Sequence, residues 1–216
     1  MKKIQLYSLA TPNGQKVSIA LEEMELEYEA HTVDITKNEQ FTKSFIQMNP
    51  NSKIPVIVDP SGPKGQSITL MESGAILLYL AEKTGLFLSE DPIQKSETIQ
   101  WLFFQMGSVG PMFGQFGHFY KYATQKCDHP YPVERYTNEV VRILGVLDKR
   151  LSQSSYIVES VSIADFAIAP WVICLDDFYQ ASTTLNLDGF YHVQKWMDKM
   201  MNRSNFQKGL GVCSFE

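Results

Sequence analysis

The sequence predicts a small α/β domain followed by a larger all-α domain. In residues 1–85, strand signals alternate with segments of helical periodicity, whereas residues 93–216 contain helical segments and no convincing pair of strands. The chain has 216 residues, which allows one or two domains, and 44% of them are hydrophobic, as in an ordinary folded protein. We expect residues 86–92 to link the two domains.

Four strands and three helices are predicted in the first domain. In chain order they are strand 3–7, helix 16–24, strand 28–33, helix 40–48, strand 54–58, strand 67–70 and helix 73–83. A helix separates the first two strands, which favours a parallel pair. The Ser-Gly-Pro-Lys-Gly cluster at 61–65 is a turn, and Gly85 is the expected C-cap of the third helix.

The second domain is predicted to be helical throughout. Its helical segments are 93–122, 133–151, 163–181 and 193–201, and Ser-Ile-Ala-Asp at 162–165 forms a capping box. Pro111 falls inside the first segment and should kink it. Small residues recur beside this proline, at Gly107, Gly110, Gly114 and Gly117. They allow either close helix packing or room for a second ligand lined by nearby aromatic residues, namely Phe113, Phe116, His118, Phe119 and Tyr120.

Charge and cysteine content exclude several classes of protein. A net charge of -5 argues against non-specific nucleic-acid binding. The three cysteines, Cys127, Cys174 and Cys213, are far apart and form no C-x-x-C motif, which favours a reducing compartment and gives no metal site. The N-terminal apolar run is broken by Gln5 and Ser8, so neither a signal peptide nor a membrane span is expected. We expect a cytoplasmic protein.

The first candidate site is the Thr-Pro-Asn-Gly turn at residues 11–14, between the first strand and the first helix. Thr11 and Asn13 place a hydroxyl and an amide at a helix N-terminus. The partial positive charge of that end favours an anion such as a thiolate. The alternative is a plain N-cap turn.

The second candidate is Lys53-Ile54-Pro55, which opens the third strand. Proline cannot donate a hydrogen bond to a sheet ladder. A cis peptide bond before Pro55 would turn the backbone groups of Ile54 outward, free to pair with an extended ligand. The alternative is a proline on an edge strand.

The third candidate is Glu72-Ser73, where the last helix of the first domain begins. Ser73 is a good N-cap, and the free N–H groups of a helix N-terminus suit a carboxylate. Glu72 can pair with an ammonium. Together they suit the two charges on the α-carbon of an amino acid, although capping alone would also explain Ser73.

The three motifs have the order and spacing found in the cytosolic glutathione transferases, which the sequence resembles over roughly residues 3–205. Within that family it is most similar to the nu class. The shared stretches are 11–14, 51–55, 72–85, Gln100-Trp101-Leu102, Gly110-Pro111-Met112, Glu134-Arg135-Tyr136 and 162–165. The resemblance implies a thioredoxin-like first domain, an all-helical second domain, glutathione as co-substrate, a homodimer, and glutathione-dependent reduction of disulfides.

The resemblance also implies a set of glutathione-binding residues: Gln40, Lys53, Ile54, Pro55, Glu72, Ser73 and Arg135. Glu72 and Ser73 would hold the γ-glutamyl end, and Ile54 would pair with the cysteinyl backbone. Lys53 and Gln40 would lie toward the glycyl carboxylate. Arg135 would reach the ligand from the helical domain.

Thr11 and Asn13 are, by the same resemblance, the catalytic residues that face the sulfur. Other classes use a tyrosine or a cysteine near this turn. Tyr7 is therefore a rival activator and Ser8 a weaker one, while no cysteine is present there. The substrate would be a small disulfide. The alternatives are conjugation of glutathione to an electrophile and a non-catalytic interaction module.

Overall fold

The computed structural model describes residues 3–215, which fall into two compact units. The first unit runs to Leu88 and also includes the chain from Asn202 onward; the second is Ser89–Met201. The change of unit after Leu88 lies inside the expected linker. The C-terminal segment differs from the expectation, because it packs with the first unit and not with the helical one.

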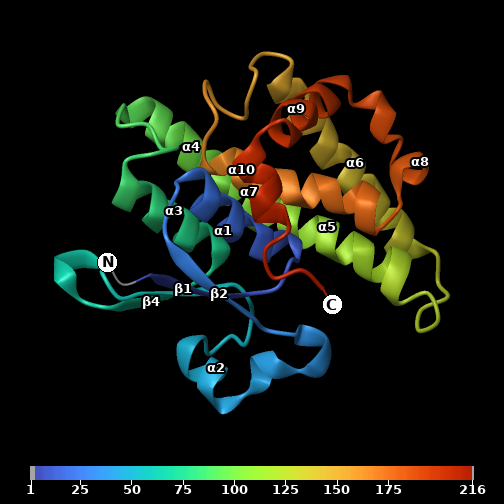
Figure 1. Ribbon diagram of the computed structural model, residues 1–216. Coiled ribbons are helices and arrows are strands. Elements are labelled where there is room, and N and C mark those ends of the chain that lie inside the picture. The colour runs from blue at the N-terminus through green and yellow to red at the C-terminus, as the bar shows by residue number, and fades with distance from the viewer. Residues whose placement is uncertain (1–2, 216) are drawn as a thin grey trace. The chain divides into compact units, whose positions relative to one another are not determined.

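The first unit is built on a mixed sheet. Its strands are β1 (Ile4–Ser8), β2 (Tyr28–Thr32), β3 (Val56–Asp59) and β4 (Ile68–Met71), in the order β2-β1-β3-β4 (Figure 1). β1 and β2 are parallel as predicted, and β3 is antiparallel to both β1 and β4. β3 begins two residues later than predicted, because Pro55 has no N–H to give to the ladder.

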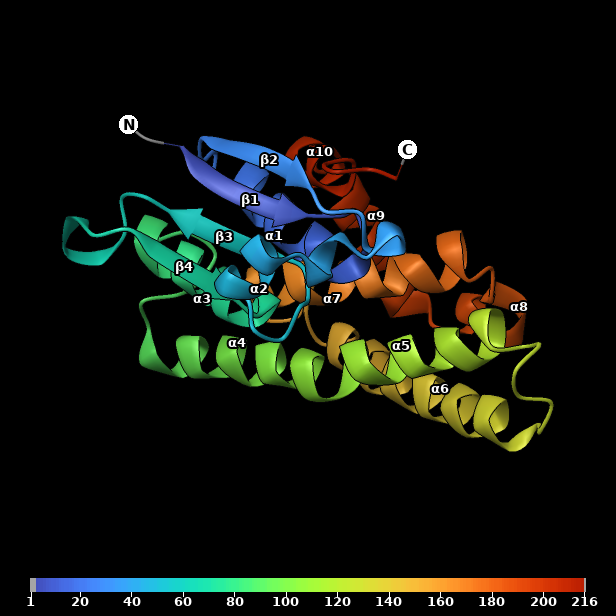
Figure 2. The same ribbon diagram turned by 90° about the horizontal axis from the view of Figure 1, so that it is seen from below.

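Helices cover both faces of this sheet. α1 (Pro12–Glu23) and α3 (Ser73–Thr84) lie on one face and α2 (Lys43–Met48) on the other (Figures 1 and 2). α1 begins four residues earlier than predicted, with Pro12 in the first helical position, where its missing N–H costs no hydrogen bond. α3 ends as predicted at Gly85, which has a left-handed φ of 70° and donates its N–H to Ala81 O at 2.8 Å.

The C-terminal helix α10 (Ser204–Leu210) packs tightly against α1 (Figure 1). A Cβ on Gly209 would lie 2.4 Å from Ile19 Cα, so only glycine fits there. Ser18 Oγ donates to Gly209 O at 2.7 Å. Arg203 forms a bidentate ion pair with the nearly buried Glu23. Its Nε donates to Oε1 at 2.7 Å and its Nη2 donates to Oε2 at 2.5 Å. These contacts explain why the segment belongs to the first unit.

The second unit consists of α4 (Pro92–Phe104), α5 (Gly110–Gly117), α6 (Tyr131–Leu151), α7 (Ile163–Ile173), α8 (Ser182–Leu185) and α9 (Tyr191–Met201). π-helical turns follow α4, α5 and α7, so the predicted long helix 93–122 is divided at Gln105–Val109. Pro111 lies in the first turn of α5, just after this division. Among the described residues, no helix is long and apolar enough to span a bilayer.

Two of the glycines near Pro111, Gly114 and Gly117, serve helix packing, whereas a Cβ on Gly107 would meet no atom within 4 Å. A Cβ on Gly114 would lie 3.3 Å from the Trp171 ring, and one on Gly117 would lie 2.0 Å from the Tyr179 ring. Phe113 and Phe116 are fully buried. Of the two interpretations of this segment, close packing is therefore the one that these four residues support.

Asp165 organises the start of α7. Its buried carboxylate accepts hydrogen bonds from Ile157 N at 2.9 Å, Ser162 N at 2.9 Å and Trp196 Nε1 at 2.8 Å. Burial raises the pKa of the Asp165 carboxyl group, and these hydrogen bonds oppose that shift. The predicted capping box is confirmed, and the same carboxylate also joins α7 to α9.

The contact at Gly209 yields a stability test. Gly209→Ala should lower the free energy of unfolding by about 1–3 kcal/mol, because the added methyl group overlaps the backbone of α1. Gly211→Ala is the matched control, since a Cβ there would have its nearest neighbour at 3.7 Å. Denaturant unfolding of both variants measures the difference. Equal stabilities would contradict the tight packing of α10 on α1.

Candidate functional site

The first turn of α1 lies against the end of β1. A Cβ on Gly14 would lie 2.0 Å from Leu9 O, so this approach requires glycine. Thr11 is half-buried and is the N-cap of α1, with its Oγ1 accepting the Gly14 N–H at 3.4 Å. A hydroxyl that accepts in this way still has a proton to donate. The N-cap turn and a donor to a ligand are therefore compatible roles for Thr11.

The C-terminal tail passes beside the same turn. Ala10, directly before Thr11, donates its N–H to Cys213 O at 2.8 Å. This hydrogen bond anchors the tail to the residue that precedes the turn. Burial raises the pKa of the Cys213 thiol, with a hydrogen bond to Thr32 opposing the shift. Burial also raises the pKa of Cys174 to about 11, so neither thiol is in an activating environment.

A buried asparagine holds the loop that carries Lys53. Asn49 is only 1% exposed; its Nδ2 donates to Lys53 O at 2.7 Å and its Oδ1 accepts from Asn51 N at 2.9 Å. Lys53 is exposed. The sequence analysis did not identify Asn49, although its short amide within an Asn-Pro-Asn-Ser stretch is typical of a turn.

Ile54 and Pro55 follow this loop and lead into β3. The bond between them is cis, as one of the two interpretations required. β3 is an interior strand of the sheet, so the alternative of an edge-strand proline is wrong. Ile54 is half-buried and packs beside the cluster of Val33, Phe45 and Val56.

The start of α3 combines an unusual backbone with two polar side chains. Glu72 has a φ of 67° and a ψ of 112°, a conformation that is uncommon outside glycine. The Glu72 side chain is exposed, whereas Ser73 is buried in the first turn of α3. The N-cap of α3 is Glu72, whose side chain makes no capping hydrogen bond, so the prediction of Ser73 as the N-cap is wrong. Glu72 directly precedes the N-terminus of α3, and Ser73 is its first helical residue.

Lys16 of α1 lies beneath this corner. It is 1% exposed, and its Nζ donates to Ser73 Oγ at 3.3 Å. Burial lowers the pKa of the Lys16 ammonium well below its ordinary value, and the negative charge of Glu72 partly opposes the shift. The sequence analysis missed Lys16, because its only signal is a charged residue in the helical segment that begins there.

Two other predicted residues are less closely tied to this group. Gln40 lies in a 3₁₀ turn after β2; its Nε2 donates to Ile35 O at 3.5 Å, and its buried Oε1 has no hydrogen-bond partner among the described residues. Arg135 is exposed on α6, in the second unit. That Arg135 contacts a ligand bound to the first unit stays a prediction.

The rival activator Tyr7 is engaged in packing. Its ring stacks on His31 with the ring centroids 4.7 Å apart, and it packs against the same cluster as Ile54. Ser8 is buried and its hydroxyl donates to Leu9 O at 3.4 Å. Both side chains therefore have structural roles in β1.

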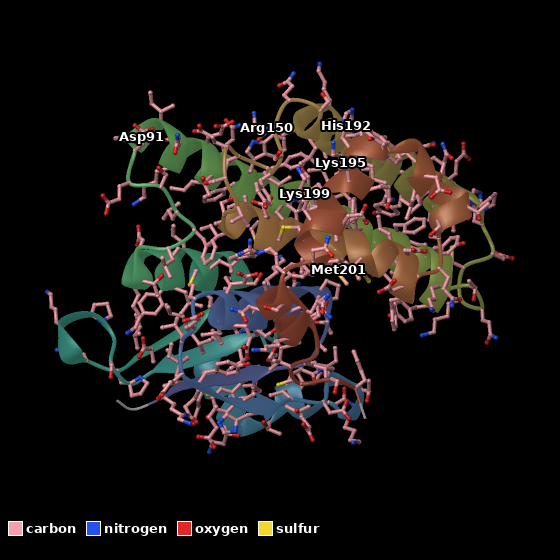
Figure 3. The ribbon with its side chains drawn as sticks, turned by 45° about the horizontal axis from the view of Figure 1, so that its top comes forward. Asp91, Arg150, His192, Lys195, Lys199 and Met201 are labelled. Atoms are coloured by element: carbon pink, nitrogen blue, oxygen red, sulfur yellow. The ribbon has the colours of Figure 1, made fainter. Side chains whose placement is uncertain are left out.

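Cavities also occur away from these residues. One of about 480 Å³ in the first unit is lined by Leu9, Thr32, Asp34, Thr36, Lys37, Glu39, Ser214 and Phe215. Another, of about 300 Å³, is lined in part by His192, Lys195 and Lys199, which follow one another along α9 (Figure 3). Neither cavity is lined by any of the predicted ligand residues.

Comparison with known proteins identifies the family. Residues 2–82 match the glutathione S-transferase N-terminal domain and residues 132–204 match its C-terminal domain. The disulfide-bond oxidoreductases YghU and YfcG of Escherichia coli are 42% and 51% identical, over 95% and 78% of this chain and 73% and 79% of their own lengths. A solved glutathione transferase of Pseudomonas putida, with one glutathione disulfide per subunit, superposes with a TM-score of 0.95 at 50% identity and covers 97% of this chain and 91% of its own. The chain belongs to the glutathione S-transferase family.

Proposed function

We propose that this enzyme uses glutathione to reduce disulfide bonds. The observation that carries the proposal is the Thr11 hydroxyl at the N-terminus of α1, a position without a cysteine in this chain. Such a site supports a thiolate supplied by a ligand instead of one supplied by the protein. The relatives named disulfide-bond oxidoreductases favour the same reaction.

The first unit offers groups that complement each end of glutathione. Glu72 and the N-terminus of α3 suit the ammonium and carboxylate of the γ-glutamyl end. Lys53 suits the glycyl carboxylate, to which Gln40 is also assigned. Ile54, at the cis Pro55, is assigned to the cysteinyl backbone.

Thr11 and Asn13 are assigned to the glutathione sulfur. A hydrogen bond to a thiolate, together with the positive end of α1, lowers the pKa of the thiol. Each pKa unit corresponds to about 1.4 kcal/mol, so two modest donors suffice to populate the thiolate at neutral pH.

The reaction balances with two glutathione molecules and no protein thiol. The first thiolate attacks one sulfur of the substrate disulfide; the S–S bond breaks, and the leaving thiolate takes up a proton. The second glutathione attacks the glutathione sulfur of the resulting mixed disulfide and releases the second substrate thiol. Two glutathione thiols are thereby oxidised to glutathione disulfide, and one disulfide is reduced to two thiols.

The assembly and its location extend the proposal. We infer a cytoplasmic homodimer, in line with the family resemblance and with the absence of a disulfide framework. Arg135 of the helical unit is assigned to a glutathione carboxylate, for which its planar guanidinium is suited. No nucleic acid, membrane or metal takes part.

Two assays run side by side test the reaction. With glutathione present, we expect turnover of 2-hydroxyethyl disulfide to exceed turnover of 1-chloro-2,4-dinitrobenzene, because the site stabilises a thiolate that attacks sulfur. Faster conjugation of the aryl halide would make the enzyme a conjugating transferase. Absence of both activities and of glutathione binding would make it an interaction module.

The thiol activator is tested by three variants. Thr11→Ala should lower kcat for the disulfide by about 10–100-fold with a smaller effect on glutathione affinity, because the hydroxyl acts mainly on the sulfur. Thr11→Ser keeps both the cap and the hydroxyl and should retain most activity, which would show that the hydroxyl, and not the methyl group, is what Thr11→Ala removes. Tyr7→Phe should change kcat only slightly. If steady-state kinetics showed a large decrease in kcat for Tyr7→Phe and a small one for Thr11→Ala, the role of thiol activator would belong to Tyr7.

The protein's own thiols should be dispensable. We expect the combined variant Cys127→Ser, Cys174→Ala, Cys213→Ser to keep most of the glutathione-dependent reductase activity, because external glutathione supplies both sulfurs. Cys213 is the decisive position, since its backbone contacts the residue before Thr11. Circular dichroism should first establish that the variant folds. Loss of turnover in a folded variant, and equally in Cys213→Ser alone, would place a protein thiol in the reaction.

A further inference from the structure

A buried lysine underlies the corner assigned to the γ-glutamyl group. Lys16 is 1% exposed, and its Nζ lies 3.3 Å from Ser73 Oγ, the hydroxyl in the first turn of α3. The negative charge of Glu72, the residue that precedes the helix, acts on Lys16 and favours its charged form. One positive and one negative side chain therefore flank the start of α3, the first buried and the second exposed.

Two effects disfavour a charged lysine at this position. The N-terminus of α3 is the positive end of a helix dipole, which disfavours a nearby cation. Burial also disfavours the charged form of lysine, as the lowered pKa of Lys16 indicates. Apolar residues of similar volume often replace buried charges with no loss of stability. A methionine at residue 16 would fill the same space without either penalty.

The proposed ligand gives a reason for positive charge in this corner. The γ-glutamyl end of glutathione carries an ammonium and a carboxylate on one carbon. Glu72 provides the negative charge for the ammonium. The carboxylate needs positive charge in the same corner, and Lys16 provides it from below, next to the Ser73 hydroxyl.

We propose that Lys16 is a positioning and specificity-determining residue: it holds the Ser73 hydroxyl in place and provides the positive charge that selects ligands with an α-carboxylate on the γ-glutamyl group. This inference rests on the proposed function, because it assumes that glutathione binds at Glu72 and Ser73. Lys16 acts through Ser73 and through its charge, and takes no part in the sulfur chemistry.

The test compares two ligands by calorimetry. S-methylglutathione has no reactive thiol, and its analogue with 4-aminobutanoyl in place of γ-glutamyl lacks only the α-carboxylate. Lys16→Met should lower the affinity for S-methylglutathione by about tenfold or more. It should lower the affinity for the analogue by less than about threefold. The Tm of the ligand-free variant should equal or exceed that of the parent. Lys208→Met, a change of an exposed lysine on α10, is the matched control and should alter neither affinity.

The outcomes separate the inference from the function on which it rests. The role of Lys16 would be overturned if Lys16→Met lowered the affinity for both ligands equally. It would also be overturned if the folded variant kept an unchanged affinity for S-methylglutathione. A lowered Tm with intact discrimination between the ligands would make Lys16 a structural residue. If Lys16→Met does not fold, Lys16→Gln keeps a donor for Ser73 without the charge and should show the same selective loss. Failure of the parent to bind S-methylglutathione, or no effect of Glu72→Gln, would instead overturn the binding site itself.

Discussion

The close contact between the first turn of α1 and the end of β1 is the constraint on which the first unit depends. Gly14 permits it, since a Cβ would lie only 2.0 Å from Leu9 O. The contact brings Thr11 and Asn13 to the end of the sheet. Farther along, the same helix places Lys16 beneath α3 and Ser18 against α10. One helix therefore positions the candidate sulfur site, the candidate γ-glutamyl site and the C-terminal segment.

Features that depend on particular residue types at fixed local spacing could be predicted from the sequence. The capping box at residues 162–165, the C-cap at Gly85 and the parallel pairing of β1 with β2 each follow from residue types at fixed spacing. The cis peptide bond before Pro55 is one of two interpretations that the local sequence allows. The other, a proline on an edge strand, is excluded only by the order of the strands in the sheet, which local sequence does not determine. Local pattern thus identified the elements and the turns between them.

Features that depend on long-range packing could not be predicted. The assignment of α10 to the first unit rests on Gly209 against Ile19 and on Arg203 with Glu23, contacts between residues far apart in the chain. Asn49 and Lys16 were missed because a polar residue gains its role only when burial and a specific partner are known. The helical periodicity of the segment 93–122 likewise gave no sign of the π-helical turn at Gln105–Val109.

The proposed site is suited to moderate activation of a thiol. In thiol–disulfide exchange the best attacking thiol has a pKa near the ambient pH, because a further decrease in pKa also lowers nucleophilicity. The Thr11 hydroxyl, the Asn13 amide and the end of α1 are neutral or only partially charged, so they lower the pKa by a limited amount. Lys16 is instead placed at Ser73, where we propose that its charge acts on a carboxylate. This division separates tight binding of the ligand's ends from mild activation of its sulfur, as a reductase that uses two glutathione molecules in turn requires.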